Sequence, residues 1–308
     1  MSPDPTPAAG FAPDLRLARF LPRSVTPDRG RLRLVRAATR VSTSLPGTRA
    51  AELPVAPGVT VRLHRPATLS APAPALLWVH GGGLVSGNAR MDERFCTRVR
   101  DELGAVVASV EYRLAPEHPF PTPLEDCWAA LSWLAAQPEV DPGRIAIGGA
   151  SAGGNLAAAL ALAARDRGGV RPVFQLLVYP MLDDRTTLRT DVDERLLRLW
   201  DQRSNRFGWG SYLGAAVGTD AVSPLAAPAR STDLAGLPPA WVGVGTLDLF
   251  HDDDVAYAHR LREAGVDCAL EVVPGAYHGF DAAEAWAPVA RAFTQAQLTA
   301  LSGALHGG

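Results

Sequence analysis

Short runs of apolar residues recur along this chain, separated by segments with helical composition. The runs are rich in β-branched residues and cover residues 59–63, 75–79, 105–110, 145–147, 173–178, 240–244 and 269–273. Near-continuous apolar character over so few residues is typical of strands buried on both faces. Residues 91–103, 123–136 and 155–167 have helical composition, and 281–304 is predicted to be one helix and a tail. The pattern predicts an α/β fold, with a mostly parallel central sheet and helices on both of its faces.

Composition excludes several classes of function. The chain has 308 residues, with 30 basic and 32 acidic side chains and a formal net charge of −2. A net charge this close to zero gives no electrostatic case for nucleic-acid binding. Every basic residue is arginine. Without lysine no Schiff base can form, so pyridoxal-phosphate enzymes and lysine-type aldolases are excluded, and a P-loop lysine is also absent.

Targeting and redox signals are weak. The three cysteines, Cys96, Cys127 and Cys268, are too widely spaced for a zinc site or a redox pair, so we expect buried thiols in a reducing compartment. The polar, proline-rich start does not resemble a signal peptide. No stretch approaches ~18 uninterrupted apolar residues, so no membrane span is expected. These features favour a cytoplasmic protein.

A serine lies in a glycine-rich turn between a predicted strand and a predicted helix. The motif is Gly149-Ala150-Ser151-Ala152-Gly153, and it follows the apolar run 145–147. Small neighbours allow a strained turn that exposes the serine hydroxyl beside a helix N-terminus, where N–H groups are free. A glycine-rich turn that only packs a helix tightly on a strand would have the same pattern.

A second glycine motif, His80-Gly81-Gly82-Gly83, directly follows the run 75–79. Glycines leave backbone N–H groups unobstructed, so they can approach a developing negative charge closely. The same residues could form a phosphate-binding turn, but the fingerprint of a dinucleotide site is absent. Together with the serine turn about 70 residues later, the motif favours an oxyanion-binding loop.

An acid and a histidine follow the last two predicted strands. Asp248 comes after the run 240–244, and His278 comes after the run 269–273. The order Ser151, Asp248, His278 is the order found in α/β-hydrolases, and all three follow carboxyl ends of strands. Asp183 and Asp184 also follow a predicted strand, so they are rival candidates for the acid that orients the histidine.

Four segments closely resemble the bacterial hormone-sensitive-lipase-like family of α/β-hydrolase esterases. They are His80-Gly81-Gly82-Gly83, the segment 112–121 (YRLAPEHPFP), the segment 151–157 (SAGGNLA) and His278-Gly279-Phe280. The resemblance runs from about residue 50 to the end of the chain. It implies an α/β-hydrolase fold with a helical cap and hydrolysis of short-chain carboxylic esters without a cofactor or metal.

The resemblance also implies roles for individual residues. It makes Ser151 the nucleophile, His278 the base and Asp248 the acid that orients His278. Gly82, Gly83 and Ala152 would supply the N–H donors of the oxyanion hole, and Gly81 would support the turn. Two positions depart from the family pattern: Ala150 stands where an aspartate is frequent, and Leu249 stands in an acid motif that usually reads D-P-L-x-D.

The resemblance divides the chain into cap and catalytic parts. We expect an N-terminal cap segment at 1–45, a catalytic domain at 46–182 and 221–308, and a cap insertion at 183–220. The insertion is far longer than an ordinary connection and is rich in aromatic residues. Its Trp209 and Tyr212 are candidates for either the cap core or the wall of the acyl pocket. Leu249 is a third candidate pocket residue, because it follows Asp248.

Other polar clusters have simpler explanations. His251 and the acids at 252–254 resemble metal ligands, but an acidic first turn of a solvated helix has the same pattern. Arg113 and Glu117 are predicted to form a structural ion pair. His80 is predicted to anchor the glycine turn rather than to transfer protons.

The sequence therefore predicts a serine carboxylesterase that acts on a small-molecule ester. It is compatible with a homodimer. Two other functions stay open. The same triad could transfer an acyl group to an acceptor other than water or hydrolyse an amide. The scaffold could also be a non-catalytic ligand receptor, although such a protein is expected to lose a member of the triad.

Overall fold

One mixed sheet forms the centre of the molecule. The computed structural model describes residues 10–24, 30–42, 50–69 and 72–307, and within them eight strands form a single sheet in the order β1-β2-β4-β3-β5-β6-β7-β8. The strands are β1 (Ala51–Ala56), β2 (Val59–His64), β3 (Ala73–Val79), β4 (Val106–Glu111), β5 (Val140–Ala150), β6 (Phe174–Val178), β7 (Ala240–Leu247) and β8 (Cys268–Tyr277). Pairing is antiparallel from β1 to β4 and parallel from β4 to β8. The predicted α/β fold with a mostly parallel sheet is confirmed.

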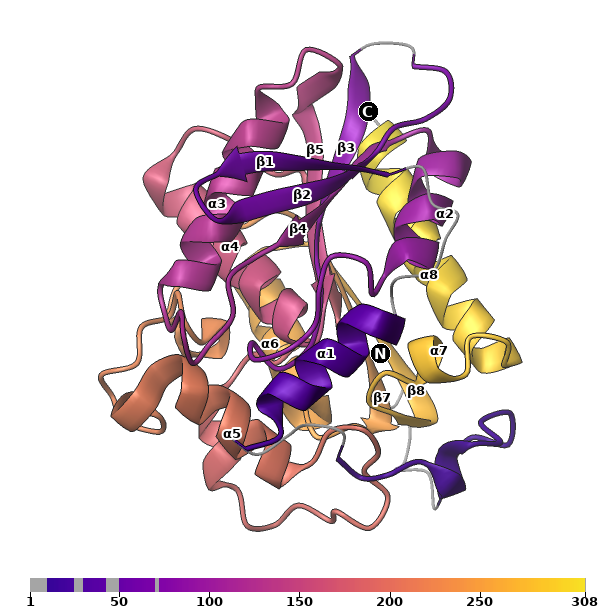
Figure 1. The fold of residues 1–308 in the computed structure, drawn as a ribbon, viewed down its shortest axis with the longest axis vertical. Helices are drawn as coiled ribbons and strands as arrows, with labels where there is room; N and C mark the ends of the chain where they lie inside the picture. The colour runs from indigo at the N-terminus through magenta and orange to yellow at the C-terminus, as the bar shows by residue number, and fades with distance from the viewer. Residues whose placement is uncertain (1–9, 25–29, 43–49, 70–71, 308) are drawn as a thin grey trace.

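Helices cover both faces of this sheet (Figure 1). The helices are α1 (Leu32–Ser42), α2 (Glu93–Leu103), α3 (Thr122–Ala135), α4 (Ala152–Arg167), α5 (Gln202–Leu213), α6 (His251–Glu263), α7 (Phe280–Ala283) and α8 (Pro288–His306). Helices α3, α4 and α6 pack on one face, and α2 and α8 pack on the other. The two faces bury separate apolar cores, which explains why the central parallel strands contain continuous apolar runs.

The C-terminal segment differs from its prediction. Residues 281–304 were expected to form one helix and a tail, but α7 ends at Ala283 and the longer helix α8 begins at Pro288. Ala287 has extended backbone angles, φ −63° and ψ 139°. Proline disfavours the helical conformation in the residue before it and cannot donate a helical hydrogen bond, but it fits the first turn of a helix well. The break before α8 therefore follows from Pro288.

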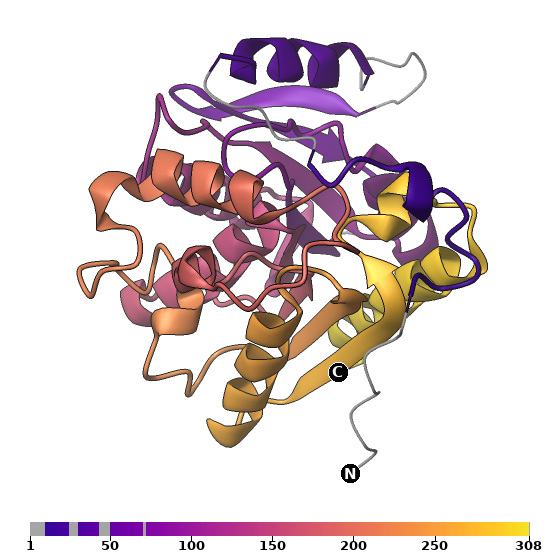
Figure 2. The ribbon, with the colours of Figure 1, turned by 90° about the horizontal axis from the view of Figure 1, so that it is seen from below.

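Two segments outside the main alternation lie at one end of the molecule. The N-terminal segment contains the short 3-10 helix η1 (Ala18–Phe20) and then α1, and the chain between β6 and β7 contains η2 (Asp184–Leu188), α5, η3 (Gly214–Ala216) and η4 (Pro228–Arg230). Helices η1, α1 and α5 all lie in the lower half of Figure 1, and Figure 2 shows α1 outside the edge of the sheet formed by β1. The boundary predicted between residues 45 and 46 lies outside the described residues.

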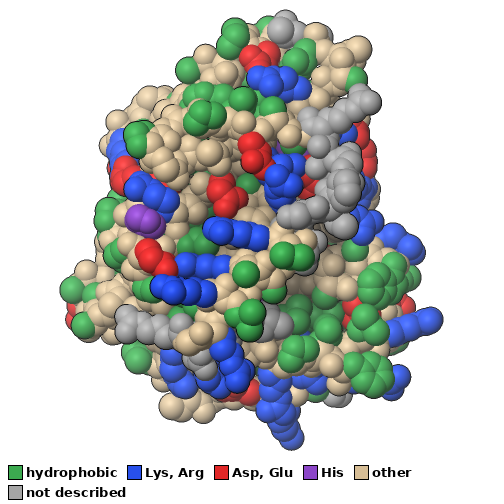
Figure 3. Space-filling view, in the orientation of Figure 1, with side chains coloured by type: hydrophobic (Ala, Val, Ile, Leu, Met, Phe, Trp, Pro, Cys, Tyr) green, Lys and Arg blue, Asp and Glu red, His purple; other side chains and the backbone are tan. Residues whose placement is uncertain are grey.

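The surface agrees with the small net charge. On the face drawn in Figure 3, basic and acidic side chains are intermixed with hydrophobic ones. No helix within the described residues is long and apolar enough to cross a membrane.

Candidate active site

Ser151 lies in the turn between β5 and α4, in a backbone conformation that residues other than glycine rarely adopt. Its φ is +57° and its ψ is −118°. A β-carbon at Gly149 would collide with the backbone of Gly153, and one at Gly153 would collide with the carbonyl of Val79. The glycines therefore let the helix start directly against the sheet, and the serine carries the strain of the turn.

The structure brings Ser151, His278 and Asp248 into one hydrogen-bonded chain. The Oγ atom of Ser151 lies 2.9 Å from Nε2 of His278, and Nδ1 of His278 lies 2.8 Å from Oδ2 of Asp248. The other carboxylate oxygen of Asp248 accepts the backbone N–H of Phe250 at 3.0 Å. All three residues are buried, with 5%, 8% and 6% of their surface exposed. Because the three residues follow β5, β8 and β7, parallel strands place them at one edge of the sheet.

The hydrogen bonds assign the tautomer of His278. A carboxylate can only accept, so Nδ1 must carry the proton that it shares with Asp248. When the imidazole is neutral, its unprotonated Nε2 faces the Ser151 hydroxyl and can accept its proton. The geometry is therefore that of a hydroxyl beside an imidazole whose orientation a buried carboxylate fixes.

The glycine turn after β3 is held from its carbonyl side. The carbonyl of Gly81 lies 2.7 Å from Nδ1 of His80, and the carbonyl of Gly82 accepts from the N–H groups of Val85 and Ser86 at 3.2 and 3.0 Å. The hydroxyl of Ser86 also donates to that carbonyl. In a trans peptide the C=O and the following N–H point in opposite directions. Holding these carbonyls therefore turns the N–H groups of Gly82 and Gly83 away from the interior of the turn.

His80 is built into this support. Burial lowers the pKa of His80, so its imidazole is neutral and can donate one proton to the Gly81 carbonyl. Its ring stacks on Tyr112 with centroids 4.3 Å apart, and the Tyr112 hydroxyl donates to the His80 carbonyl. A β-carbon added to Gly81 would lie 3.3 Å from Cβ of Ser151, so the turn passes directly beside the serine.

Comparison with known proteins decides the family. A family model for the α/β-hydrolase fold matches residues 76–282 of the chain. This range includes the glycine turn, Ser151, Asp248 and His278. The chain belongs to this hydrolase family. Within it, the chain is a member of the hormone-sensitive-lipase-like bacterial esterases, as its motifs predicted.

Several relatives of this hydrolase are esterases. It is 38% identical to esterase LipI of Mycobacterium tuberculosis over 81% of this chain and 79% of the relative. It is 36% identical to an ethyl acetate hydrolase of Pseudomonas putida over 71% of this chain and 70% of the relative. The solved structure of a bacterial heroin esterase superposes with a TM-score of 0.86 and 39% identity, covering 96% and 98% of the two chains. The chain is a carboxylic ester hydrolase, and the predicted enzyme class is confirmed.

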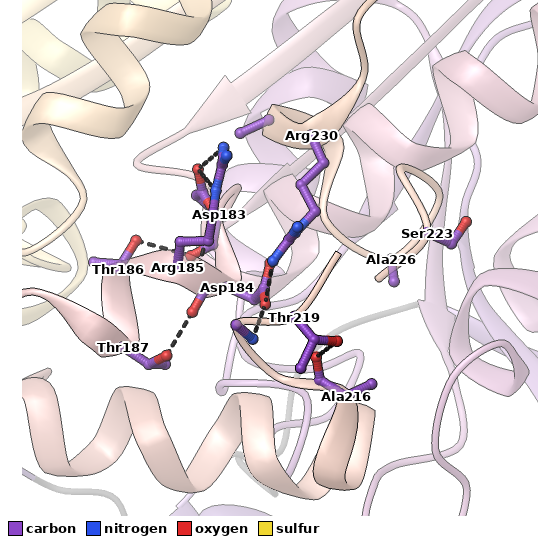
Figure 4. Close-up of polar contacts among 12 residues, drawn as sticks. Asp183, Asp184, Arg185, Thr186, Thr187, Ala216, Thr219, Ser223, Ala226 and Arg230 are labelled. Atoms are coloured by element: carbon purple, nitrogen blue, oxygen red, sulfur yellow. Dashed lines mark hydrogen bonds and ion pairs between the residues drawn. The ribbon is translucent and has the colours of Figure 1, made fainter. Parts of the chain in front are cut away.

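The rival acids of the hydrolase bind other partners (Figure 4). Asp183 accepts from the guanidinium and the backbone N–H of Arg185 and begins η2. Asp184 is fully buried, and its carboxylate contacts Arg230 at 2.5 and 3.0 Å and the N–H of Gly218 at 2.6 Å. Asp184 therefore fastens the segment before β7 to the end of β6, and Asp248 is the carboxylate that contacts His278.

Trp200, which the sequence did not identify, forms a wall beside the glycine turn. Its ring lies so close to Gly83 that a β-carbon there would overlap it. The ring centroid is 6.3 Å from that of His278 and 6.4 Å from that of Phe250. Trp200 is 4% exposed and comes from the insertion, directly before α5. The aromatic content of the insertion was visible in the sequence, but not which ring faces the site.

The three predicted pocket residues occupy different places. Trp209 is fully buried, and Tyr212 packs edge-on against Phe120 with centroids 5.8 Å apart. Tyr212 also lines a largely apolar cavity of about 730 Å³ beside α5, whose lining residues include none of the hydrogen-bonded chain of Ser151. Leu249 lines a cavity of about 320 Å³ together with Asp248.

A further cavity is lined in part by Ala150, the residue before Ser151. It measures about 400 Å³, and Ala150, Tyr179, Asp92 and Asp281 line part of it. The Tyr179 ring meets His278 edge-on with centroids 4.8 Å apart, and its hydroxyl donates to Asp281 at 2.8 Å. Burial raises the pKa of Asp92 to about 6 and also raises the pKa of Asp281. Arg94, Arg98 and Arg291 also line the cavity, so Tyr179 separates the imidazole from a cavity with both acidic and basic side chains.

Two predictions about polar clusters differ from the structure, one of them only in part. The acids at 252–254 form the first turn of α6 as expected, and Asp252 is exposed and pairs with Arg189, but Asp254 is fully buried. Arg113 and Glu117 do not pair with each other: Arg113 binds Asp126 at 2.6 Å, and Glu117 binds Arg36. Among the described residues, no group of three or more His, Cys, Asp and Glu side chains could hold a metal ion.

Proposed function

We propose that this chain is a serine carboxylesterase that hydrolyses short-chain carboxylic esters through an acyl-enzyme on Ser151. The observation that carries the proposal is the hydrogen-bonded chain from Ser151 Oγ through His278 to Asp248, with spacings of 2.9 and 2.8 Å. A serine hydroxyl is a weak nucleophile unless a base removes its proton, and His278 is placed to do so.

In the first step, Nε2 of His278 takes the Ser151 proton while Oγ attacks the ester carbonyl. The imidazole becomes a cation, and the Asp248 carboxylate stabilises it while remaining ionised. The protonated Nε2 then donates its proton to the alkoxide oxygen as the carbon–oxygen bond breaks. The alcohol leaves, and the acyl group stays on Ser151.

The carbonyl oxygen becomes negative in the tetrahedral intermediate, and backbone N–H groups can stabilise it. We assign this role to Gly82, Gly83 and Ala152. Holding the Gly81 and Gly82 carbonyls turns the next N–H groups outward, and Ala152 is the first residue of α4, where a helix has free N–H groups. Gly81 keeps the turn beside Ser151. Each such donor is worth about 3–4 kcal/mol of transition-state stabilisation in comparable sites.

In the second step, water replaces the alcohol. His278 takes a proton from the water molecule as its oxygen attacks the acyl carbon, and the same donors stabilise the second tetrahedral intermediate. His278 then returns the proton to Ser151 Oγ, and the carboxylic acid leaves. The cycle needs no group beyond those of the chain and water.

A cap built from the N-terminal segment and the insertion would limit substrate size. The two parts contact each other: the Leu199 N–H donates to the Pro22 carbonyl at 2.9 Å, Arg198 donates to the Ala18 carbonyl at 2.6 Å, and the hydroxyls of Ser24 and Ser204 are 2.6 Å apart. These contacts flank Trp200, which stands beside the glycine turn. A bulky ring there favours small acyl groups, in agreement with the similarity to an ethyl acetate hydrolase.

Replacing the serine tests the proposal. Ser151→Ala removes one hydroxyl and should lower the hydrolysis of p-nitrophenyl acetate by at least about 10³-fold, because the nucleophile is lost. Its melting temperature should stay close to that of the wild type. An organophosphate should add one phosphoryl group per chain at Ser151, detected by peptide mass spectrometry. A variant that keeps a rate within tenfold of the wild type would rule out the serine mechanism.

A further inference from the structure

One arginine of the N-terminal helix α1 reaches the catalytic domain. Nε of Arg36 donates to the carbonyl of Val85 at 2.8 Å, and Nη2 donates to the carbonyl of Ala115 at 2.7 Å. Both terminal nitrogens also donate to the Glu117 carboxylate at 2.9 Å. Glu117 is half exposed, so this ion pair contributes little by itself. The bonds to the two carbonyls are the specific part of the contact.

Val85 belongs to the turn that orients the glycine N–H groups. Its own N–H donates to the Gly82 carbonyl at 3.2 Å, and its side chain is fully buried. The Ala115 N–H donates to the Leu84 carbonyl at 3.0 Å, so the two loops that Arg36 bridges are also bonded to each other. A shift of Val85 would therefore loosen the donors on the Gly82 carbonyl, and the peptide that carries the Gly83 N–H could rotate.

Helix α1 depends on such polar contacts for its position. Leu32, at its first turn, is buried in the core, whereas Leu34 and Val41 are 70% and 77% exposed. Apolar packing is thus concentrated at the start of the helix. Arg36 lies one turn later and donates hydrogen bonds to two backbone carbonyls. Backbone atoms are less free to move than the end of a flexible side chain.

We propose that Arg36 is a positioning residue for the oxyanion hole. By holding the carbonyls of Val85 and Ala115 it fixes the Gly82–Gly83 peptide with the Gly83 N–H toward the reacting carbonyl. The proposal rests on the function proposed above, in which that N–H stabilises the tetrahedral intermediate. Arg36 acts through the loop, so its loss weakens binding of the tetrahedral state more than binding of the ester.

The test compares three neutralising substitutions in the full-length protein. Arg36→Gln removes the bonds to both carbonyls. Arg33→Gln makes the same change of charge on an exposed position of the same helix, and Glu117→Gln removes the ion pair but leaves the carbonyl bonds in place. For each variant, kcat and KM are measured with p-nitrophenyl acetate. Inhibition constants are measured for a trifluoromethyl ketone, which Ser151 converts to a tetrahedral oxyanion, and for the matching unfluorinated ketone.

We expect Arg36→Gln to lower kcat about tenfold and to weaken inhibition by the trifluoromethyl ketone about tenfold. A misaligned donor should cost less than the roughly 10²- to 10³-fold loss of kcat that follows deletion of a donor. KM and the inhibition constant of the unfluorinated ketone should change less than twofold. The two control variants should stay within twofold of the wild type in all four quantities. Arg36→Lys, which cannot span both carbonyls with one ammonium group, should fall between Arg36→Gln and the wild type.

Two results would overturn the proposal. In the first, Arg36→Gln behaves like Arg33→Gln. In the second, Arg36→Gln raises KM and weakens inhibition by both ketones equally, as expected if Arg36 only attaches α1 to the catalytic domain. If Arg36→Gln does not fold, Arg36→Lys decides: wild-type affinity for the trifluoromethyl ketone would exclude a positioning role. Failure of the proposed function looks different, because the wild type itself would then not be inhibited by the trifluoromethyl ketone and Ser151→Ala would remain active.

Discussion

Asp248 and Asp184 are both buried carboxylates, but their partners differ. Asp248 contacts the imidazole of His278, whereas Asp184 contacts the guanidinium of Arg230. Asp248→Asn should therefore lower kcat by about 10²- to 10⁴-fold, because the amide no longer selects the correct tautomer of His278. Asp184→Asn should keep kcat within about tenfold but lower the free energy of unfolding by about 3–5 kcal/mol, because it leaves a buried guanidinium unpaired.

Steady-state kinetics and urea denaturation of the two variants check this prediction. Asp183→Asn is the control, since its carboxylate binds the partly exposed Arg185 and should change either quantity little. A severe kinetic defect in Asp184→Asn, with a mild one in Asp248→Asn, would reverse the assignment of the orienting acid.

Asp254 should make the stability of the protein depend on pH. Its carboxyl group is fully buried, and neither oxygen has a hydrogen-bond partner among the described residues. Burial raises its pKa well above the ordinary value, with a contribution from the nearby Asp248. The folded protein therefore holds this proton at pH values where the unfolded chain has released it. This difference lowers the free energy of unfolding by about 1.4 kcal/mol per pH unit between the unfolded pKa near 3.9 and the folded pKa.

Asp254→Asn should remove this loss, since the amide does not ionise. Urea denaturation at pH 5 and pH 8 is expected to show the variant gaining stability relative to the wild type as the pH rises. The same difference between variant and wild type at both pH values would mean that Asp254 does not titrate in this range. Ala256, on the exposed face of the same helix, offers Ala256→Gln as a control without a pH effect.

Membership of the candidate site was predictable only where a local motif marks a residue. Ser151, His278 and the glycine turn lie in short patterns whose proposed chemistry follows from neighbours in the chain. Trp200 and Arg36 have no such pattern. Their positions depend on contacts with residues more than forty positions away, at Gly83 and Val85, which no local reading of the sequence provides.

At the scale of elements, each of the seven apolar runs overlaps a strand. Burial on both faces explains the runs of the central strands, whereas the run 269–273 lies in the partly exposed edge strand β8. Strand β1 was not predicted. It lies at the edge of the sheet, is half exposed, and includes Glu52 and Pro54, so it lacks the apolar signal that marks the buried strands. The paired positions of the antiparallel β1–β2 ladder, not the composition of β1, define this strand.

The N-terminal segment should control which esters enter. Deleting residues 1–24 removes the contacts of Ala18 and Pro22 with the loop that carries Trp200, and that of Ser24 with the first turn of α5. Activity of the intact enzyme should peak at an acyl chain of roughly two to eight carbons, as the family resemblance implies. The deletion should flatten this profile. Once Trp200 can move, burial of each added methylene of the acyl chain contributes about 0.8 kcal/mol of binding free energy. Rates with p-nitrophenyl esters of increasing length measure it.

Trp200→Ala provides the matched comparison, because it opens the same wall without shortening the chain. Both variants should shift activity toward longer esters. A soluble deletion variant with an unchanged profile, beside a Trp200→Ala variant with a broadened one, would show that the N-terminal segment does not hold the wall.

At the scale of the whole molecule, the three thiols should report global unfolding. Cys96, Cys127 and Cys268 are all within the described residues, and each is unpaired and buried. Burial raises the pKa of Cys96 and Cys127 well above the ordinary value and that of Cys268 to about 11. At pH 8 the native protein should therefore resist iodoacetamide and keep full activity, because only an exposed thiolate reacts rapidly. In denaturing urea all three should react, as counted by intact-mass spectrometry. Rapid labelling of Cys96 or Cys127 under native conditions would indicate local opening of α2 or α3 instead.

The N-terminal segment contacts residues that lie far from it along the chain. The Ala12 N–H donates to the Gly275 carbonyl, and the Leu17 N–H donates to the carboxylate of Glu284. Contacts between such distant residues close a long loop, which slows their formation during folding. Gly275 and Glu284 flank His278 in the sequence, so docking of residues 12–17 and ordering of the chain around His278 are expected to be coupled when the protein refolds.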